Sequence, residues 1–202
     1  MEINKKELKE QEVRTMFITP ALQQKGWAVS VNMREEYYFT DGRVLVVGNQ
    51  HSVAEGKKAD YLLYHKGKPI AVVEAKDNKH AVGGGIQQAM DYAQILDLKF
   101  AYSSNGDAFL EHDFITGKET EIKLEEFPTE EELYNRYLAS KSYTSEELNI
   151  IETPFYYDAH SHEPRYYQRI AVDRTVEAIA RGQQRVLVVM ATGTGKTFTA
   201  FQ

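Results

Sequence analysis

Two runs of β-forming residues joined by a short turn decide the fold of this chain: ADYLLY at residues 59–64 and IAVVEAK at residues 70–76, with HKGKP between them at residues 65–69. β-Branched and aromatic residues fill both runs, whereas Gly67 is typical of a tight turn. We therefore predict a hairpin of two antiparallel strands. If the turn is centred on Gly67, Leu62 faces Val72 across the hairpin and Asp60 faces Glu74.

Asp60 and Glu74 thus bring two carboxylates together, with Cβ atoms roughly 5 Å apart. Like charges opposed on a sheet are destabilising, so a fold that keeps them there usually holds a cation, and oxygen ligands suit Mg²⁺ or Mn²⁺. Lys76 lies on the same face as Glu74 because side chains alternate along a strand. A divalent ion can generate hydroxide, and an ammonium can stabilise charge on a phosphate. The trio is therefore typical of phosphodiester hydrolysis.

An alternative interpretation makes Glu74 and Lys76 an exposed charged edge and lets Asp60 merely begin a strand. The surrounding residues favour the metal site, because both strands are apolar on two faces, as expected of a covered, central hairpin: Leu62, Leu63, Val72 and Val73. Carboxylates rarely occupy such places without a partner.

The segment that follows has helical periodicity. Gly83-Gly84-Gly85 ends a loop that we interpret as flexible, and residues 86–96 place an apolar stripe on one helical face, formed by Ile86, Ala89, Met90, Ala93 and Leu96. Gln88 and Tyr92 are four residues apart and project together. They are either a polar pair beside the buried stripe or a pair that holds the lysine or a DNA phosphate.

A family resemblance rests on these motifs and on the segments around them, which are Glu10–Arg14 with Pro20–Leu22 and Gly26-Trp27, Lys57–Tyr61, Val73–Lys76, Gln88-x-x-x-Tyr92, Phe100–Gly106 and Asp113–Gly117. The resemblance that they carry extends over nearly the whole chain. They resemble the PD-(D/E)xK nuclease core of the endonuclease (R, HsdR) subunit of type I restriction enzymes, in its N-terminal part.

The resemblance implies a role for each matching position. Asp60, Glu74 and the backbone carbonyl of Ala75 would bind Mg²⁺ or Mn²⁺, and Lys76 would be the catalytic lysine. Gln88 and Tyr92 would form the pair associated with DNA cleavage or translocation. One position departs from the motif, because Ala59 stands where its proline belongs.

The first helix of such folds usually adds an acidic residue to the site. We expect a helix over residues 5–25, in which Leu8, Val13, Met16 and Phe17 define an apolar arc. Glu12 falls inside this arc and is the predicted site residue. Glu10 is nearly as suitable, and either glutamate is equally well explained as a partly solvated helix residue.

A second motif lies near the end of the sequence. Residues 185–190, RVLVVM, are consistent with a buried parallel strand, and ATGTGKT follows at 191–197. In such a loop backbone N–H groups surround phosphates, Lys196 reaches the β and γ oxygens, and Thr197 binds Mg²⁺. Met190 occupies the place of the first glycine in the usual pattern. The motif instead resembles the ATP-binding loop of superfamily-two helicases, with Gly193, Thr194 and Gly195 at its centre.

Gln168 resembles the glutamine that reads adenine in those helicases, although an ordinary surface position on a helix explains it equally well. Because the sequence ends at Gln202, we expect a truncated motor domain whose ATP hydrolysis belongs to residues outside this chain. We expect the tail from about Arg165 either to dock on the nuclease domain or a neighbouring chain, or to be partly disordered.

The composition sets outer limits on the function. With 202 residues and 42% hydrophobic content, the chain can bury one core and the beginning of another. It has no cysteine, no secretory signal and no membrane-length apolar run, so we expect a cytoplasmic protein. A net charge of −6 argues against a generally basic nucleic-acid binder, although lysines cluster around the proposed site. His160 and His162 we interpret as solvated linker.

The predicted fold is α/β: a restriction-endonuclease-like mixed sheet flanked by helices, then a helical linker, then the first strand and phosphate-binding loop of a truncated RecA-like domain. The corresponding domains are 1–140, 141–164 and 165–202. Besides the hairpin, we expect strands near 28–31, 44–47, 99–103 and 108–111, and helices over 129–140 and from Thr144.

The function that follows from the resemblance is Mg²⁺-dependent endonucleolytic cleavage of double-stranded DNA, coupled in the full protein to ATP-driven translocation. Its partners would be the methyltransferase and specificity subunits, and we expect little or no cleavage by this fragment alone. Two alternatives stay open, namely the nuclease domain of a DNA-repair helicase-nuclease and a degenerate docking module without activity.

Overall fold

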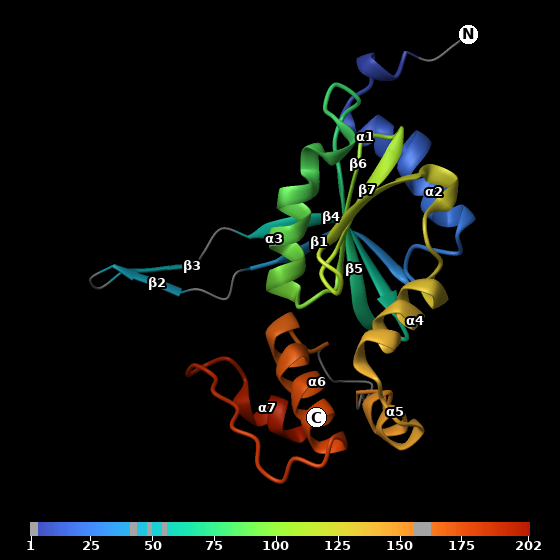
Figure 1. The fold of residues 1–202 in the computed structure, drawn as a ribbon. Helices are drawn as coiled ribbons and strands as arrows, with labels where there is room; N and C mark the ends of the chain where they lie inside the picture. Colours follow the sequence, from blue (N-terminus) through green and yellow to red (C-terminus); the bar gives the residue numbers. More distant parts are fainter. Residues whose placement is uncertain (1–3, 41–43, 48–49, 54–55, 156–162) are drawn as a thin grey trace. The chain divides into compact units, whose positions relative to one another are not determined.

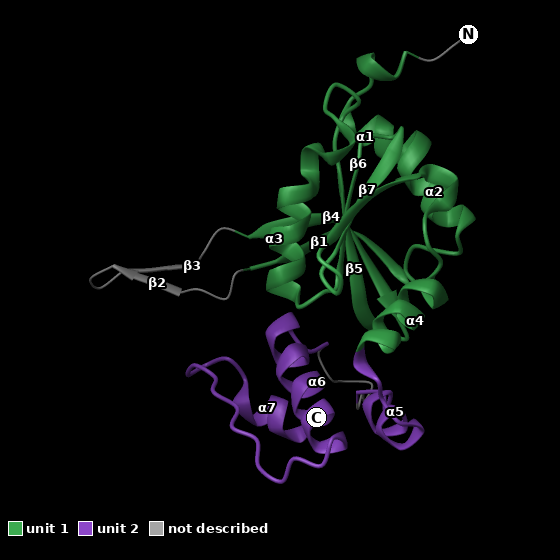
Figure 2. Cartoon of the chain, in the orientation of Figure 1, with its two compact units in different colours: residues 1–140 green, residues 141–202 purple. Residues whose placement is uncertain are grey.

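The computed structural model describes residues 4–40, 44–47, 50–53, 56–155 and 163–202, with the backbone alone described at 44–47 and 50–53. The chain divides into two compact units, Met1–Ser140 and Lys141–Gln202 (Figure 2). The separate linker region proposed for 141–164 stays a prediction.

Unit 1 is built on a six-stranded mixed sheet with the strand order β1-β4-β5-β6-β7-β8. Neighbouring strands are antiparallel except β5 and β6, which are parallel and connected through a helix. The strands are β1 (Met33–Phe39), β4 (Lys57–His65), β5 (Lys68–Ala75), β6 (Phe100–Ser104), β7 (Ala108–Asp113) and β8 (Lys118–Lys123). The predicted α/β sheet is confirmed, and β8 is a strand that the sequence did not indicate.

Helices cover both faces of this sheet (Figure 1). The helix α3 (Ile86–Leu96) lies on one face after a 3₁₀ turn, η3 (Val82–Gly85). The helices α1 (Glu10–Val13), α2 (Thr19–Gln24) and α4 (Glu130–Lys141) lie on the other. The predicted helices at 85–96 and 129–140 are confirmed. A further 3₁₀ turn, η4 (Leu124–Glu126), precedes α4.

The central hairpin has the predicted register, with Leu62 opposite Val72 and Tyr61 opposite Val73. Its turn is tighter than expected, because His65 pairs with Lys68 and only Lys66 and Gly67 lie between them. Both have positive φ, +46° and +79°, as in a type I′ turn. A register shift between Leu63 and Tyr64 reconciles this two-residue turn with the pairing deeper in the hairpin.

The first helical region differs from the single regular helix predicted for residues 5–25. It consists of η1 (Lys5–Glu7), α1 (Glu10–Val13), a π-helical turn η2 (Arg14–Ile18) and α2 (Thr19–Gln24). A π turn widens the helix by about one residue per turn, so a helical wheel loses its phase beyond it. Met16, expected in the apolar arc, is therefore 42% exposed, whereas Arg14 and Ile18 are buried.

Two other predicted strands are corrected. Residues 28–31 form a turn rather than a strand, because Asn32 Oδ1 accepts a hydrogen bond from the backbone N–H of Ala28 and Ser30 has a φ of +66°. Residues 44–47 do form a strand, β2 (Val44–Val47), but it pairs with β3 (Gln50–Val53) in a separate two-stranded sheet.

The core of unit 1 lies between the sheet and the helices α1, α2 and α4. Its largest fully buried side chains are aromatic: Trp27, Tyr61, Phe100, Tyr102, Phe109 and Phe127. Trp27 donates a hydrogen bond from Nε1 to the carbonyl of Pro128, at 2.9 Å. This bond ties the end of the first helical region to the segment before α4.

Unit 2 contains α5 (Ser145–Ile151), α6 (Tyr166–Ala180) and α7 (Lys196–Phe201). The predicted strand at 185–190 is absent from the described part of this unit: Leu187 is 88% and Val189 84% exposed, and the segment has no ladder partner. An extended segment becomes a strand only by pairing, so the apolar pattern alone does not create one.

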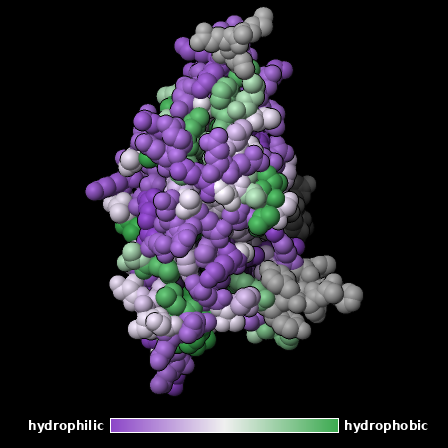
Figure 3. Space-filling view, turned by 90° about the vertical axis from the view of Figure 1, so that its right-hand side faces the viewer, coloured by the Kyte–Doolittle hydropathy of each residue, from purple (hydrophilic) through white to green (hydrophobic). Residues whose placement is uncertain are grey.

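No helix in the described residues is long and apolar enough to cross a membrane. The face shown in Figure 3 is mostly hydrophilic, with apolar residues in small separate patches.

Gly106 generates a stability prediction, because it lies against the first helical region. It has a φ of +84°, and a Cβ there would lie 2.8 Å from Val13 Cγ1 and 3.3 Å from Phe17 Cβ. We expect Gly106→Ala to lower the free energy of unfolding by about 2–4 kcal/mol, from backbone strain and overpacking together.

The matched control is Gly117→Ala, since Gly117 has a φ of +70° but nothing within 4 Å of the added Cβ. Backbone strain alone should cost this variant about 1 kcal/mol. Equal losses in urea titrations of the two variants would contradict the close packing described for Gly106.

Candidate active site

Asp60 lies on β4 and is buried, with 5% of the residue exposed. Its Oδ2 accepts a hydrogen bond of 2.8 Å from the backbone N–H of Ala75 on β5, and its Oδ1 lies 3.2 Å from Arg14 Nη1. Both carboxylate oxygens are therefore engaged. The bond to Ala75 also places Asp60 beside the end of β5, which carries Glu74.

Glu74 is more deeply buried, at 3% exposure. Its Oε1 lies 3.3 Å from Lys76 Nζ, whereas its Oε2 is buried and has no hydrogen-bond partner. Burial and, second, the nearby negative charge of Asp60 raise the pKa of Glu74 to about 8, although Lys76 acts in the opposite direction. Without a further cation, this carboxyl is therefore mostly protonated at neutral pH.

Lys76 is held from a second side by α3. Its Nζ donates to Gln88 Oε1 at 3.1 Å, and Gln88 Nε2 donates to the hydroxyl of Tyr92 at 3.0 Å. The Tyr92 ring packs edge-on against Phe39 of β1, with 5.2 Å between ring centroids. The structure thus brings Gln88 and Tyr92 together, as their helical spacing predicted, and Gln88 contacts Lys76, which was one of the alternatives left open for the pair.

The glycine run before α3 forms a 3₁₀ turn rather than an irregular loop, and its flexibility stays a prediction. Gly83 to Gly85 belong to the 3₁₀ turn η3, and the backbone N–H of Gly85 donates to Ser103 Oγ at 2.9 Å. A Cβ on Gly85 would lie 3.1 Å from Glu74 Cγ and 3.2 Å from Lys76 Cε. Glycine here lets the start of α3 close directly over the two site residues.

Glu12, predicted as the acidic contribution of the first helix, is not brought to the site. It is exposed, and its carboxylate accepts a hydrogen bond of 2.7 Å from the backbone N–H of Lys9, which caps the start of α1. Its alternative, Glu10, is also exposed. The wheel that favoured Glu12 assumed a regular helix, and the π turn that begins at Arg14 directs that residue inward instead.

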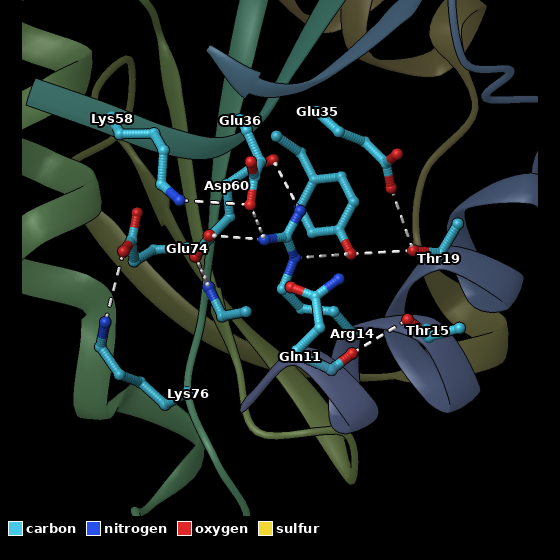
Figure 4. Close-up of polar contacts among 12 residues, drawn as sticks. Gln11, Arg14, Thr15, Thr19, Glu35, Glu36, Lys58, Asp60, Glu74 and Lys76 are labelled. Atoms are coloured by element: carbon cyan, nitrogen blue, oxygen red, sulfur yellow. Dashed lines mark hydrogen bonds and ion pairs between the residues drawn. The ribbon is translucent and has the colours of Figure 1, made fainter. Parts of the chain in front are cut away.

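Two residues that were not predicted as part of the site complete the arrangement, Arg14 from the π turn and Glu36 from β1 (Figure 4). Arg14 Nη1 lies 3.2 Å from Glu36 Oε1 as well as from Asp60 Oδ1. The position of Arg14 next to the apolar Val13 could have suggested an inward side chain, but no sequence signal indicates Glu36, which lies in a polar run.

The residues present fit a hard divalent cation. Two carboxylates approach one another, and one of their oxygens is buried without a partner, which is costly unless an unseen group satisfies it. Within the described residues, no group of three or more His, Cys, Asp or Glu side chains has metal-binding geometry. A metal here would therefore depend on Asp60, Glu74 and backbone or water oxygens, and the role of the Ala75 carbonyl stays a prediction.

In unit 2, the loop at 191–197 has the left-handed backbone expected of its glycines, with φ of +80° at Gly193 and +83° at Gly195. Gln168 is buried, and its Nε2 donates to the carbonyl of Thr194 at 2.9 Å, so it contacts the predicted phosphate-binding loop. Lys196 and Thr197 begin α7 and are exposed. Nucleotide binding by these residues stays a prediction.

Two family models match the sequence. Residues 34–118 match the second domain of the type I restriction enzyme EcoKI endonuclease subunit, and residues 161–202 match the res subunit of type III restriction enzymes.

Individual relatives agree with these matches. The chain is 43% identical to the type I restriction enzyme EcoAI endonuclease subunit of Escherichia coli, over 100% of this chain and 25% of that protein. It is 28% identical to the EcoKI endonuclease subunit of Escherichia coli K12, over 96% of this chain and 21% of that protein. The chain thus spans about a quarter of the length of these relatives.

A solved structure agrees as well. It is a fragment of a protein assigned as an HsdR subunit of a type I restriction enzyme from Vibrio vulnificus YJ016, with a TM-score of 0.81 and 45% identity. The match covers 96% of this chain and 37% of the solved one. Taken together with the mixed sheet and the carboxylate pair, these likenesses show that the chain belongs to the family of type I restriction enzyme endonuclease subunits.

Proposed function

We propose that unit 1 is a nuclease domain that hydrolyses DNA phosphodiesters with the help of Mg²⁺ or Mn²⁺. The observation that carries this proposal is the buried pair of Asp60 and Glu74 beside Lys76, in which Glu74 Oε2 has no partner. Without metal, protonation of Glu74 relieves the repulsion between the two groups; a bound dication would compensate both carboxylates in their ionised form at neutral pH.

Each side chain has a definite task in this reaction. Asp60 and Glu74 would hold the cation, which would polarise a phosphate oxygen and activate a water for attack. The Lys76 ammonium, whose reach is restricted by Gln88, would orient that water or stabilise charge on the phosphate. Tyr92 holds Gln88 in turn, so the pair from α3 acts on the reaction through Lys76.

The rest of the proposal concerns the larger protein. The loop at 191–197, with Gln168, would belong to an ATP-binding domain that drives DNA translocation. Its likeness to the res-subunit model and the left-handed glycines support this assignment. Double-stranded DNA would be the substrate, and the methyltransferase and specificity subunits would supply target recognition.

The first prediction concerns cleavage by the full subunit, assembled with its methyltransferase and specificity subunits. Asp60→Asn and Lys76→Ala should each reduce DNA cleavage by about 100-fold or more, because each removes a charge that acts on the transition state. ATP hydrolysis by the same complexes should stay at the wild-type rate, since it belongs to the other domain.

Lys79→Ala is the matched control, because Lys79 is an exposed lysine three residues beyond Lys76. It should cleave normally. If Asp60→Asn and Lys76→Ala also cleave normally, unit 1 is a docking module and the nuclease proposal fails.

The second prediction follows from the pKa of Glu74, which rises from 4.5 to about 8 on folding. Between these values the folded state binds more protons than the unfolded state, so the contribution of Glu74 to stability is lost as the pH rises. In EDTA, Glu74→Gln should therefore gain stability relative to the wild type between about pH 5 and pH 9, on the order of a few kcal/mol.

Urea titrations at several pH values measure this difference. Glu121→Gln is the control, because Glu121 is exposed and on β8, and its difference from the wild type should not change over this pH range. A pH-independent difference for Glu74→Gln as well would mean that Glu74 ionises normally in the fold.

A further inference from the structure

The guanidinium of Arg14 occupies a position between two carboxylates (Figure 4). Its Nη1 lies 3.2 Å from Asp60 Oδ1 and 3.2 Å from Glu36 Oε1. The side chains of Arg14 and Asp60 are 5% and 7% exposed, whereas that of Glu36 is 45% exposed. One nitrogen therefore bridges a buried acid of the candidate metal site and a half-exposed acid beside it.

Strand register explains why these groups meet. Glu35 pairs with Tyr61 and Tyr37 pairs with Ala59, so Glu36 lies across from Asp60 on the adjacent strand. Glu36 itself has a φ of +51°, a conformation that costs a non-glycine residue about 1 kcal/mol and that interrupts the ladder at this residue. Three acids, Glu36, Asp60 and Glu74, thus follow one another across β1, β4 and β5.

Arg14 has other contacts that hold it in place. Its Nε lies 3.5 Å from the Tyr61 hydroxyl, and its guanidinium carbon lies 5.0 Å from the centre of the Tyr61 ring. Lys58 Nζ lies 3.2 Å from the same Glu36 oxygen that Arg14 contacts. Glu36 is thus shared between a buried cation and a lysine that is 38% exposed and can move into solvent.

We propose that Arg14 is a resident counter-ion of Asp60 that a divalent cation has to displace, and that Glu36 receives it. The inference rests on the proposed metal site. A dication and a guanidinium that share one carboxylate repel each other, so metal binding favours movement of Arg14 away from Asp60. Because Nη1 already contacts Glu36, Arg14 needs only a small shift to exchange one partner for the other.

Arg14 and Glu36 are then positioning residues that set the metal affinity. Without metal, Arg14 keeps the buried charge of Asp60 compensated, which stabilises the fold. When the metal is bound, the carboxylate of Glu36 balances the charge of the displaced Arg14 guanidinium. Removal of Arg14 should therefore tighten metal binding, and removal of the Glu36 charge should weaken it, because Arg14 then stays on Asp60.

Titration of the 202-residue chain with Mn²⁺, followed by electron paramagnetic resonance of the free ion, tests this exchange. We expect Arg14→Gln to bind Mn²⁺ about 10-fold more tightly than the wild type and Glu36→Gln about 5-fold more weakly. The matched control is Glu35→Gln, at an exposed neighbouring position. Among the described residues, the Glu35 carboxylate contacts the Thr19 hydroxyl, at 3.4 Å. The Mn²⁺ affinity of this variant should stay at the wild-type value.

The double variant Arg14→Gln/Glu36→Gln separates exchange from simple charge effects. If Glu36 acts through Arg14, the double variant binds Mn²⁺ as tightly as Arg14→Gln alone. If Glu36 is itself a ligand, or acts only by its field, its replacement weakens binding equally in both backgrounds and the inference is overturned.

Weaker binding by Arg14→Gln would also overturn it, because Arg14 would then orient Asp60 rather than compete for it. Should Arg14→Gln not fold, equal Mn²⁺ affinities of Glu36→Gln and Glu35→Gln, two variants at exposed positions, still contradict the exchange. If the wild type and all variants fail to bind Mn²⁺, the proposed metal site fails as well, which distinguishes that outcome from the others.

Discussion

Two acidic side chains buried side by side on neighbouring strands are the constraint on which the rest of this fold depends. Each carboxylate removed from water needs a compensating charge or donor. Asp60 obtains these from the Ala75 backbone and Arg14, and Glu74 obtains one from Lys76 and leaves one oxygen without a partner. The elements around the pair are arranged so that each supplies one of these groups.

Two irregular features bring the first helical region and the start of α3 close enough to contact the site residues Asp60, Glu74 and Lys76. The π turn η2 directs Arg14 toward β4, although a regular helix of the same sequence would present another residue there. On the opposite side, the lack of a side chain at Gly85 lets the start of α3 approach Glu74 and Lys76, so that Gln88 reaches the lysine. The site is thus a product of departures from regular geometry on both faces of the sheet.

The parts of this arrangement that depend on strand alternation, turn residues and helical spacing could be predicted from the sequence. Alternation along β4 and β5 and a turn near Gly67 place Asp60 close to the end of β5, whereas the exact pairing depends on the register shift between Leu63 and Tyr64, which the sequence does not indicate. The spacing of Gln88 and Tyr92 on one helix likewise fixes their contact.

The parts that depend on tertiary contacts could not be predicted. A helical wheel does not reveal a π turn, so the wheel favours Glu12, whereas in the structure Arg14 contacts Asp60. Glu36 lies in a polar run, and only strand pairing and a left-handed backbone place it beside Asp60. The apolar run at 185–190 has strand composition but no strand partner among the described residues, so its sequence pattern does not suffice.

The most direct test of the central claim is a crystal of this chain soaked in Mn²⁺, with data collected for anomalous scattering. The account predicts an anomalous peak between Asp60 and Glu74, about 2.0–2.3 Å from an oxygen of each. Data that show no peak at this place under saturating Mn²⁺, with both carboxylates arranged as in the metal-free chain, would contradict it.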